Sequence, residues 1–152
     1  MRKAVKIGAE SVDLLCNAVT PILYKHVFQG DILRDLMACR KITTEDPILD
    51  DSVVEMMTQE QKEAYLKKLT DHEEKQLQLF SEMTDAVSKL AFVMAKQAEY
   101  ADRGEAIRLT GLGEDDYWGW MGQFGAFDLV RATKEIIGVY NADMKTSSKR
   151  KN

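Results

Sequence analysis

The stretch from Glu73 to Tyr100, EEKQLQLFSEMTDAVSKLAFVMAKQAEY, decides the fold of this chain. It contains neither glycine nor proline, and its apolar residues recur at steps of three and four, the spacing of one face of an α-helix. A helix of this length spans roughly 40 Å. Its apolar stripe must therefore lie against other parts of the chain or against a partner. The stripe consists of Leu77, Phe80, Met83, Val87, Leu90, Ala91, Met94, Ala95 and Ala98.

The two ends of this predicted helix differ. Phe92 and Val93 lie off the stripe and broaden the apolar surface between Leu90 and Met94. We therefore expect that end to be buried more deeply than the end near Glu73.

Toward the N-terminus, the residues from Ala4 to Cys16 have the alternating pattern of a β-hairpin, with Gly8-Ala9-Glu10-Ser11 as its turn. An isolated hairpin is marginally stable, so we expect a helix or another subunit to cover it. Thr20-Pro21 then indicates a helix start, because threonine can cap free N–H groups and proline suits the first turn. Gly30 is expected to end this helix, and Asp31 to cap the next one.

The middle of the chain is acidic. Residues 45–74 hold ten acids against three lysines, a net charge of −7. We expect 43–71 to form a solvated, mobile connection with one helix at 58–69, because too few apolar groups offset the entropy of ordering. The alternative is that this segment attracts a basic partner.

Toward the C-terminus, glycines at 104, 111 and 113 indicate a loop. Three acids from Glu114 to Asp116 favour a short helix beginning near Asp115, since acids stabilise the positive end of a helix. A final helix is predicted from Asp128 to Asn141. Residues 144–152 are rich in lysine, serine and threonine and are expected to be a disordered basic tail.

These elements predict an α+β fold that is mainly α-helical. Its N-terminal β-hairpin packs on a bundle with one long central helix at about 73–100 and a C-terminal helical pair. We expect 1–143 to form a single globular domain.

Bulk properties restrict the classes of function. Hydrophobic residues make up 45% of the 152 and charged residues 30%, which is typical of a globular chain rather than a disordered one. A net charge of −4 argues against general attraction to nucleic acid, and no apolar run has the length of a membrane span. The N-terminus lacks the apolar region of a signal peptide. Two cysteines, Cys16 and Cys39, lack histidines at ligand spacing, so we expect reduced thiols in the cytoplasm.

Catalytic motifs are not found. His26 and His72 are the only histidines, which excludes most catalytic sites and zinc sites that depend on histidine. The glycines at 111 and 113 lack the following Gly-Lys of a phosphate-binding loop. We therefore predict a non-enzymatic protein with no catalytic residues, no metal and no cofactor.

Binding through apolar contact remains. Eight methionines and a cluster of aromatic residues suit a surface that accepts varied apolar helices. The alternative is that the cluster belongs to the core around the long helix. Because two tryptophans stand two positions apart, one helical face cannot bury both, so one is the better candidate for a partner. The candidate protein-binding residues are Tyr117, Trp118, Trp120, Met121 and Phe124.

Taken together, the chain resembles the tail assembly chaperones of long-tailed bacteriophages and prophages, particularly those of Gram-positive hosts. The matching stretches, in order, are the hairpin with Thr20-Pro21, Tyr24-Lys25, Phe28 and Gly30-Asp31-Ile32-Leu33; then Leu90 to Lys96; and then Glu114 to Trp120 with Phe124, Glu135-Ile136-Ile137, Tyr140-Asn141 and the Lys/Ser tail. Two features depart from the family pattern: the acidic 45–72 connection is longer, and Gln29 separates Phe28 from Gly30.

The resemblance implies a non-enzymatic assembly factor in the host cytoplasm. Such a protein coats the tape measure protein while the tail is built, then gives way to tail tube (major tail) subunits and is absent from the virion. It also implies a longer form made by programmed frameshifting, and Arg150-Lys151-Asn152 is compatible with a slippery A-rich codon run. Self-association is a further expectation, because the hairpin and the long stripe both permit it.

Two other functions stay open from the sequence. The first is a small regulatory, DNA-binding protein of a phage or prophage, since helices at 21–29 and 31–40 resemble a helix-turn-helix. DNA binding is disfavoured because Asp31 and Asp35 offset the positive charges of the second helix. The second is a structural tail or connector subunit that is retained in the particle.

Overall fold

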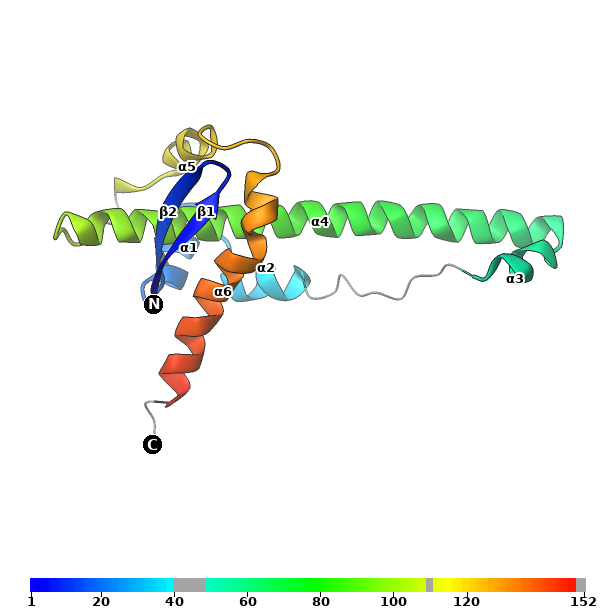
Figure 1. The fold of residues 1–152 in the computed structure, drawn as a ribbon, viewed down its shortest axis with the longest axis horizontal. Helices are drawn as coiled ribbons and strands as arrows, with labels where there is room; N and C mark the ends of the chain where they lie inside the picture. Colours follow the sequence, from blue (N-terminus) through cyan, green and yellow to red (C-terminus); the bar gives the residue numbers. More distant parts are fainter. Residues whose placement is uncertain (40–48, 109–110, 150–152) are drawn as a thin grey trace.

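The computed structural model describes residues 1–39, 49–108 and 111–149. It is mainly helical with an N-terminal antiparallel hairpin, one long central helix and C-terminal helices, which confirms the predicted fold class (Figure 1). In chain order the elements are β1 (Arg2–Ile7), β2 (Glu10–Leu15), α1 (Thr20–Phe28), α2 (Ile32–Cys39), α3 (Asp51–Glu55), α4 (Gln59–Asp102), α5 (Glu114–Met121) and α6 (Asp128–Lys149).

The central helix α4 is 44 residues long and begins at Gln59 rather than at Glu73. A capping box starts it: the Thr58 hydroxyl accepts from the Gln61 N–H at 3.3 Å, and the Gln61 side chain accepts from the Thr58 N–H at 2.9 Å. No glycine or proline follows before Asp102, so nothing breaks the ladder of backbone hydrogen bonds. The prediction of a connection over 43–71 with a separate helix is therefore wrong from residue 59 onward, and 40–48 lies outside the described residues.

The two halves of α4 have different surroundings. From Ala86 to Ala98 the helix is buried on nearly every side, and Leu90, Phe92 and Met94 are fully buried, as the sequence predicted. Residues 59–85, which we call the projecting half, extend away from the body of the molecule (Figure 1). The predicted stripe residues Leu77 and Phe80 lie on this half and are exposed.

The hairpin supplies the second layer of the core. Val5 pairs with Val12 in the antiparallel register, and the inner face buries Val5, Ile7 and Leu14. The hairpin lies between α4 and α6, with β2 mainly against α4 and β1 mainly against α6, and these helices provide the cover that we expected from the sequence. Gly8 has φ +63°, and a Cβ there would lie 2.3 Å from a carboxylate oxygen of Asp128. Only glycine fits this turn.

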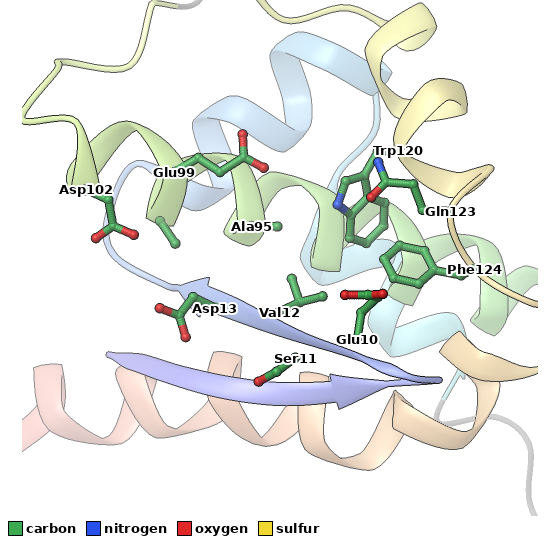
Figure 2. Close-up of a pocket in the computed structure, with 11 residues that line it drawn as sticks. Glu10, Ser11, Val12, Asp13, Ala95, Glu99, Asp102, Trp120, Gln123 and Phe124 are labelled. Carbon is green, nitrogen blue, oxygen red and sulfur yellow. The ribbon is translucent and has the colours of Figure 1, made fainter.

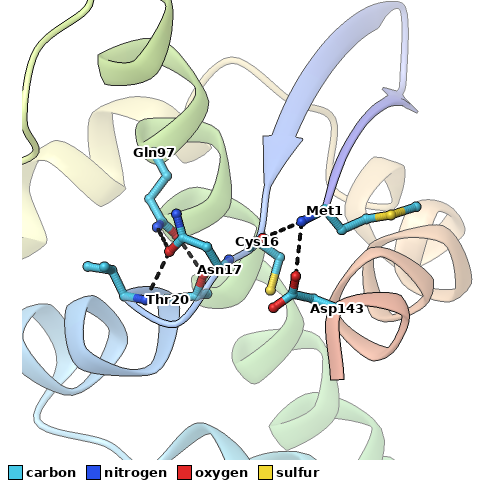
Figure 3. Close-up of polar contacts among 7 residues, drawn as sticks. Met1, Cys16, Asn17, Thr20, Gln97 and Asp143 are labelled. Atoms are coloured by element: carbon cyan, nitrogen blue, oxygen red, sulfur yellow. Dashed lines mark hydrogen bonds and ion pairs between the residues drawn. The ribbon is translucent and has the colours of Figure 1, made fainter. Parts of the chain in front are cut away.

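A buried polar network joins the end of the hairpin to α4 (Figure 3). The Thr20 hydroxyl donates to Gln97 Oε1 at 2.7 Å, and Gln97 Nε2 donates to Asn17 Oδ1 at 2.8 Å. Thr20 also accepts from the Asn17 N–H at 3.0 Å. Thr20 therefore does not cap α1, contrary to the sequence prediction, because its hydroxyl is occupied by these contacts.

Replacing Gln97 with alanine should test this network. Thr20 is fully buried, so its hydroxyl would lose its acceptor with no water to replace it, and we expect a loss of about 2 kcal/mol in the free energy of unfolding. Urea denaturation measures the change. The control is Gln78→Ala, which removes an exposed contact to Glu82 on the same helix and should cost less than about 0.5 kcal/mol.

Helix boundaries elsewhere differ from the prediction in two places. α1 ends at Phe28, and its C-cap residue Gln29 takes the left-handed conformation (φ 53°) that the sequence led us to expect of Gly30. Asp31 caps α2 as predicted, with its carboxylate accepting from the N–H groups of Leu33 and Arg34. α6 continues to Lys149, so residues 144–149 of the expected disordered tail are helical.

Candidate functional site

Helix α5 positions the predicted aromatic cluster. Its three N-terminal acids stand where the sequence placed them, and Asp116 accepts a hydrogen bond from the Gly113 N–H at 2.9 Å. Carboxylates at this end complement the positive pole of the helix, and the helix then buries Tyr117 and Trp120, which are three positions apart on one face.

The five candidate residues are not equally accessible. Tyr117 and Trp120 are buried at 3% and 5% exposure, whereas Trp118 is 62% exposed. This confirms that the two tryptophans cannot share one face. Met121 and Phe124 are half-buried. Of the cluster, Trp118 alone has most of its surface exposed.

The buried aromatic residues form a continuous edge-to-face series that links α1, α4 and α5. The ring of Phe92 lies 5.6 Å from that of Tyr117 and 5.7 Å from that of Trp120. Phe28 contacts Tyr117 at 5.0 Å, and Trp120 contacts Phe124 at 4.7 Å. Edge-to-face geometry is the favoured arrangement of aromatic pairs. These side chains therefore serve mainly to hold α5 on the body.

A groove of about 290 Å³ lies beside Trp120 and Phe124, between β2, α5 and the C-terminal end of α4 (Figure 2). Arg2 forms ion pairs with Asp13 and Asp102, each at 2.6 Å, at one end of this groove. The guanidinium group lowers the pKa of Asp102 below its usual range. Asp102 is thus held as a charged partner of Arg2, an arrangement that serves structure more directly than proton transfer.

Three further observations concern thiol reactivity, metal binding and membrane-spanning helices. Burial raises the pKa of the Cys16 thiol, which disfavours the reactive thiolate. Among residues 1–39, 49–108 and 111–149, no three His, Cys, Asp or Glu side chains lie close enough to hold a metal ion. Within the same residues, no helix is long and apolar enough to cross a membrane.

The buried tyrosines predict a loss of stability at alkaline pH. Burial raises the pKa of Tyr117 to about 12 from an ordinary value of 10.0, and it also raises the pKa of Tyr24 and Tyr140. The pKa of Tyr117 is higher in the folded chain than in the unfolded chain, so the unfolded chain loses the phenol proton first as the pH rises. The stability that protonated Tyr117 contributes is therefore complete below pH 10 and is lost as the pH rises toward 12. Denaturation at successive pH values checks this. Tyr117→Phe should weaken the decline, and an unchanged profile would contradict the assignment.

A second apolar surface lies at the far end of the projecting half. Here α3 folds against the start of α4, and the two enclose an open hollow of about 750 Å³. Met56 is 87% exposed and Val53 46% exposed, although both are apolar. Tyr65 fixes the arrangement by accepting a hydrogen bond from the Leu49 N–H at 2.9 Å. We call this the tip surface; it is lined by Leu49, Val53, Met56, Met57, Gln61, Ala64, Tyr65 and Lys68.

Sequence reasoning missed the tip surface because it averaged charge over 43–71. The residues Leu49, Val53 and Met56 recur at steps of four and three, which is a helical apolar face hidden among acids. That spacing was the signal that could have found it.

Comparisons with protein-family models, with curated proteins and with solved structures each returned no match.

Proposed function

We propose that this chain is a phage tail assembly chaperone that binds the tape measure protein and keeps it in solution during tail assembly. One observation carries the proposal: α3 and the projecting half of α4 hold apolar side chains in the open, away from the body that would otherwise bury them. Folded chains rarely expose contiguous apolar patches without a partner for them.

The chemistry of the tip surface suits such a target. Met56 and Met57 are unbranched and polarizable, so they adapt to apolar side chains of different shape. A tape measure protein is extended and helical with repeating but non-identical apolar stripes, as the family resemblance implies. An adaptable surface can cover such stripes one after another and release them to tail tube subunits.

Trp118 is a second contact point in this proposal. It is exposed beside the body, whereas the tip surface lies at the far end of α4 (Figure 1). Two separate apolar contacts, one on α5 and one at the tip surface, would engage a long target at two places, which strengthens binding without requiring either contact to be tight.

Co-expression tests the proposal. The chain is produced together with a fragment of the tape measure protein from the same genome, and the soluble fraction of the fragment is measured. We expect a several-fold increase over co-expression with an unrelated protein of similar size. No increase would contradict the chaperone function.

The competing function of a structural subunit has its own test. Mass spectrometry of purified phage particles should find the tape measure protein and not this chain. Detection of the chain at stoichiometric amounts would favour the retained subunit. The frameshifted long form is tested by the nucleotides that encode Arg150-Lys151-Asn152, which must contain a slippery heptamer.

A further inference from the structure

Helix α3 is too short to be stable by itself. It runs from Asp51 to Glu55 and buries none of its side chains. Its N-cap residue, Asp50, makes no side-chain hydrogen bond to the helix. Helices of this length do not persist in water unless tertiary contacts hold them. α3 is therefore helical only while it stays against α4.

Few contacts hold α3 in this position. Within the described residues, α3 packs extensively against no other helix or strand. The Leu49 N–H donates to the Tyr65 hydroxyl at 2.9 Å across the hollow, and this hydrogen bond is exposed, so water competes for both groups. Val54 and Met57 are only half-buried. A segment with so little buried contact opens locally at a small cost in free energy.

The connection between α3 and α4 allows one helix to move without the other. α4 begins with its own capping box, in which Thr58 and Gln61 satisfy each other's N–H groups. Neither of these bonds involves α3. Residues 56–58 lie outside both helices, so rotation about them would move α3 as a unit and leave the first turn of α4 intact.

Movement of α3 would change what the tip surface offers to a partner. Val53, Met56 and Met57 line the hollow on the side of α3, and Ala64 and Tyr65 line it on the side of α4. Opening would separate the two sides and expose more of Met57 and Tyr65, which are half-buried. Closing onto an apolar segment seated in the hollow of about 750 Å³ would bury both sides at once.

We propose that α3 is a strap, hinged at residues 56–58, that swings away from α4 and closes again over an apolar segment seated in the hollow. The seated segment supplies the apolar burial that α3 lacks in the free chain, so binding and closing are coupled. Opening of the strap follows from the few contacts of α3 itself. Closing over a target deepens the proposed chaperone function and rests on it. Release of the target then requires α3 to open and leaves the body folded.

Amide hydrogen exchange in the free chain tests the opening. The amides of α3 should exchange within about tenfold of the rate of an unstructured peptide, whereas those of residues 90–94 should be slowed by more than about a thousandfold. Tyr65→Phe removes the acceptor of the Leu49 N–H, so exchange in α3 should rise to the rate of an unstructured peptide. Strong protection of α3, or an unchanged rate in Tyr65→Phe, would overturn the proposal.

Thr58→Ala is the matched control for the hinge. It removes the side-chain cap of α4 and leaves the Tyr65 hydroxyl in place. Exchange should rise in the first two turns of α4 and stay unchanged in α3. If each of the two substitutions raised exchange in both helices, α3 and the start of α4 would open as one unit, and the hinge would be wrong.

The fragment of the tape measure protein from the co-expression test supplies the arm for closing. Added to the purified chain, it should slow exchange in α3 by about tenfold or more and leave residues 86–98 unchanged. A fragment that binds without slowing exchange in α3 would overturn the closing of the strap. A fragment that does not bind would contradict the chaperone function together with the closing step, whereas the opening of α3 is decided by the free chain alone.

Discussion

Phe92→Ala is expected to lower the free energy of unfolding by about 4 kcal/mol, the largest stability effect of any single truncation that we predict. Phe92 is fully buried and its ring contacts Phe28, Tyr117 and Trp120 at once. Its removal leaves a cavity where α1, α4 and α5 meet, and three aromatic contacts are lost together with the buried area. Chemical denaturation of the purified variant measures the change.

Phe80→Ala is the matched control, since it is the same truncation on the same helix. Phe80 is 42% exposed, so its replacement should cost less than about 1 kcal/mol. Similar losses for the two variants would contradict the division of α4 into a buried and a projecting half.

The second large effect concerns binding. Val53→Asp combined with Met56→Asp should abolish the solubilising effect on the tape measure fragment and weaken binding by about 100-fold. Both side chains are exposed on the tip surface, and two carboxylates there would have to be desolvated against an apolar target. The co-expression assay and a direct binding measurement both report the change.

The fold should survive this substitution, because neither side chain is buried. Leu33→Asp with Met37→Asp provides the control, since these residues are 50% and 62% exposed on α2, away from the tip surface. If the control variant lost solubilising activity to the same degree, general surface hydrophobicity and not the tip surface would be responsible.

Periodicity and spacing predicted the parts of the molecule that depend on local pattern. The repeat from Leu77 to Ala98 is unbroken, and Trp118 and Trp120 must diverge on any helix, so both features could be derived without a structure. The start of α4 differs from the prediction, because an acidic composition favours mobility whereas the local helix signals extend the helix to Gln59. What decides that boundary is the Thr58 cap and the absence of any breaker after it.

Features that depend on contacts between residues far apart in the chain could not be predicted from the sequence. Thr20 looked like a helix cap because the adjacent Pro21 favours that interpretation, but its hydroxyl donates to Gln97, which is 77 residues away. The tip surface likewise requires α3 to fold back on α4, and neither segment reveals this alone. Tyr117 and Trp120 are candidate binding residues by sequence, but both pack against Phe92 and lie in the core.

The placement of the hairpin between α4 and α6 has a consequence for synthesis of the chain. The hairpin is made before α6, yet part of its cover comes from α6, which packs against β1. During synthesis, Val5 and Ile7 are therefore fully buried from solvent only after α6 has been made. The core of the body can therefore be completed only after α6 has been translated, whereas α3 and the first turns of α4 precede α6 in the chain.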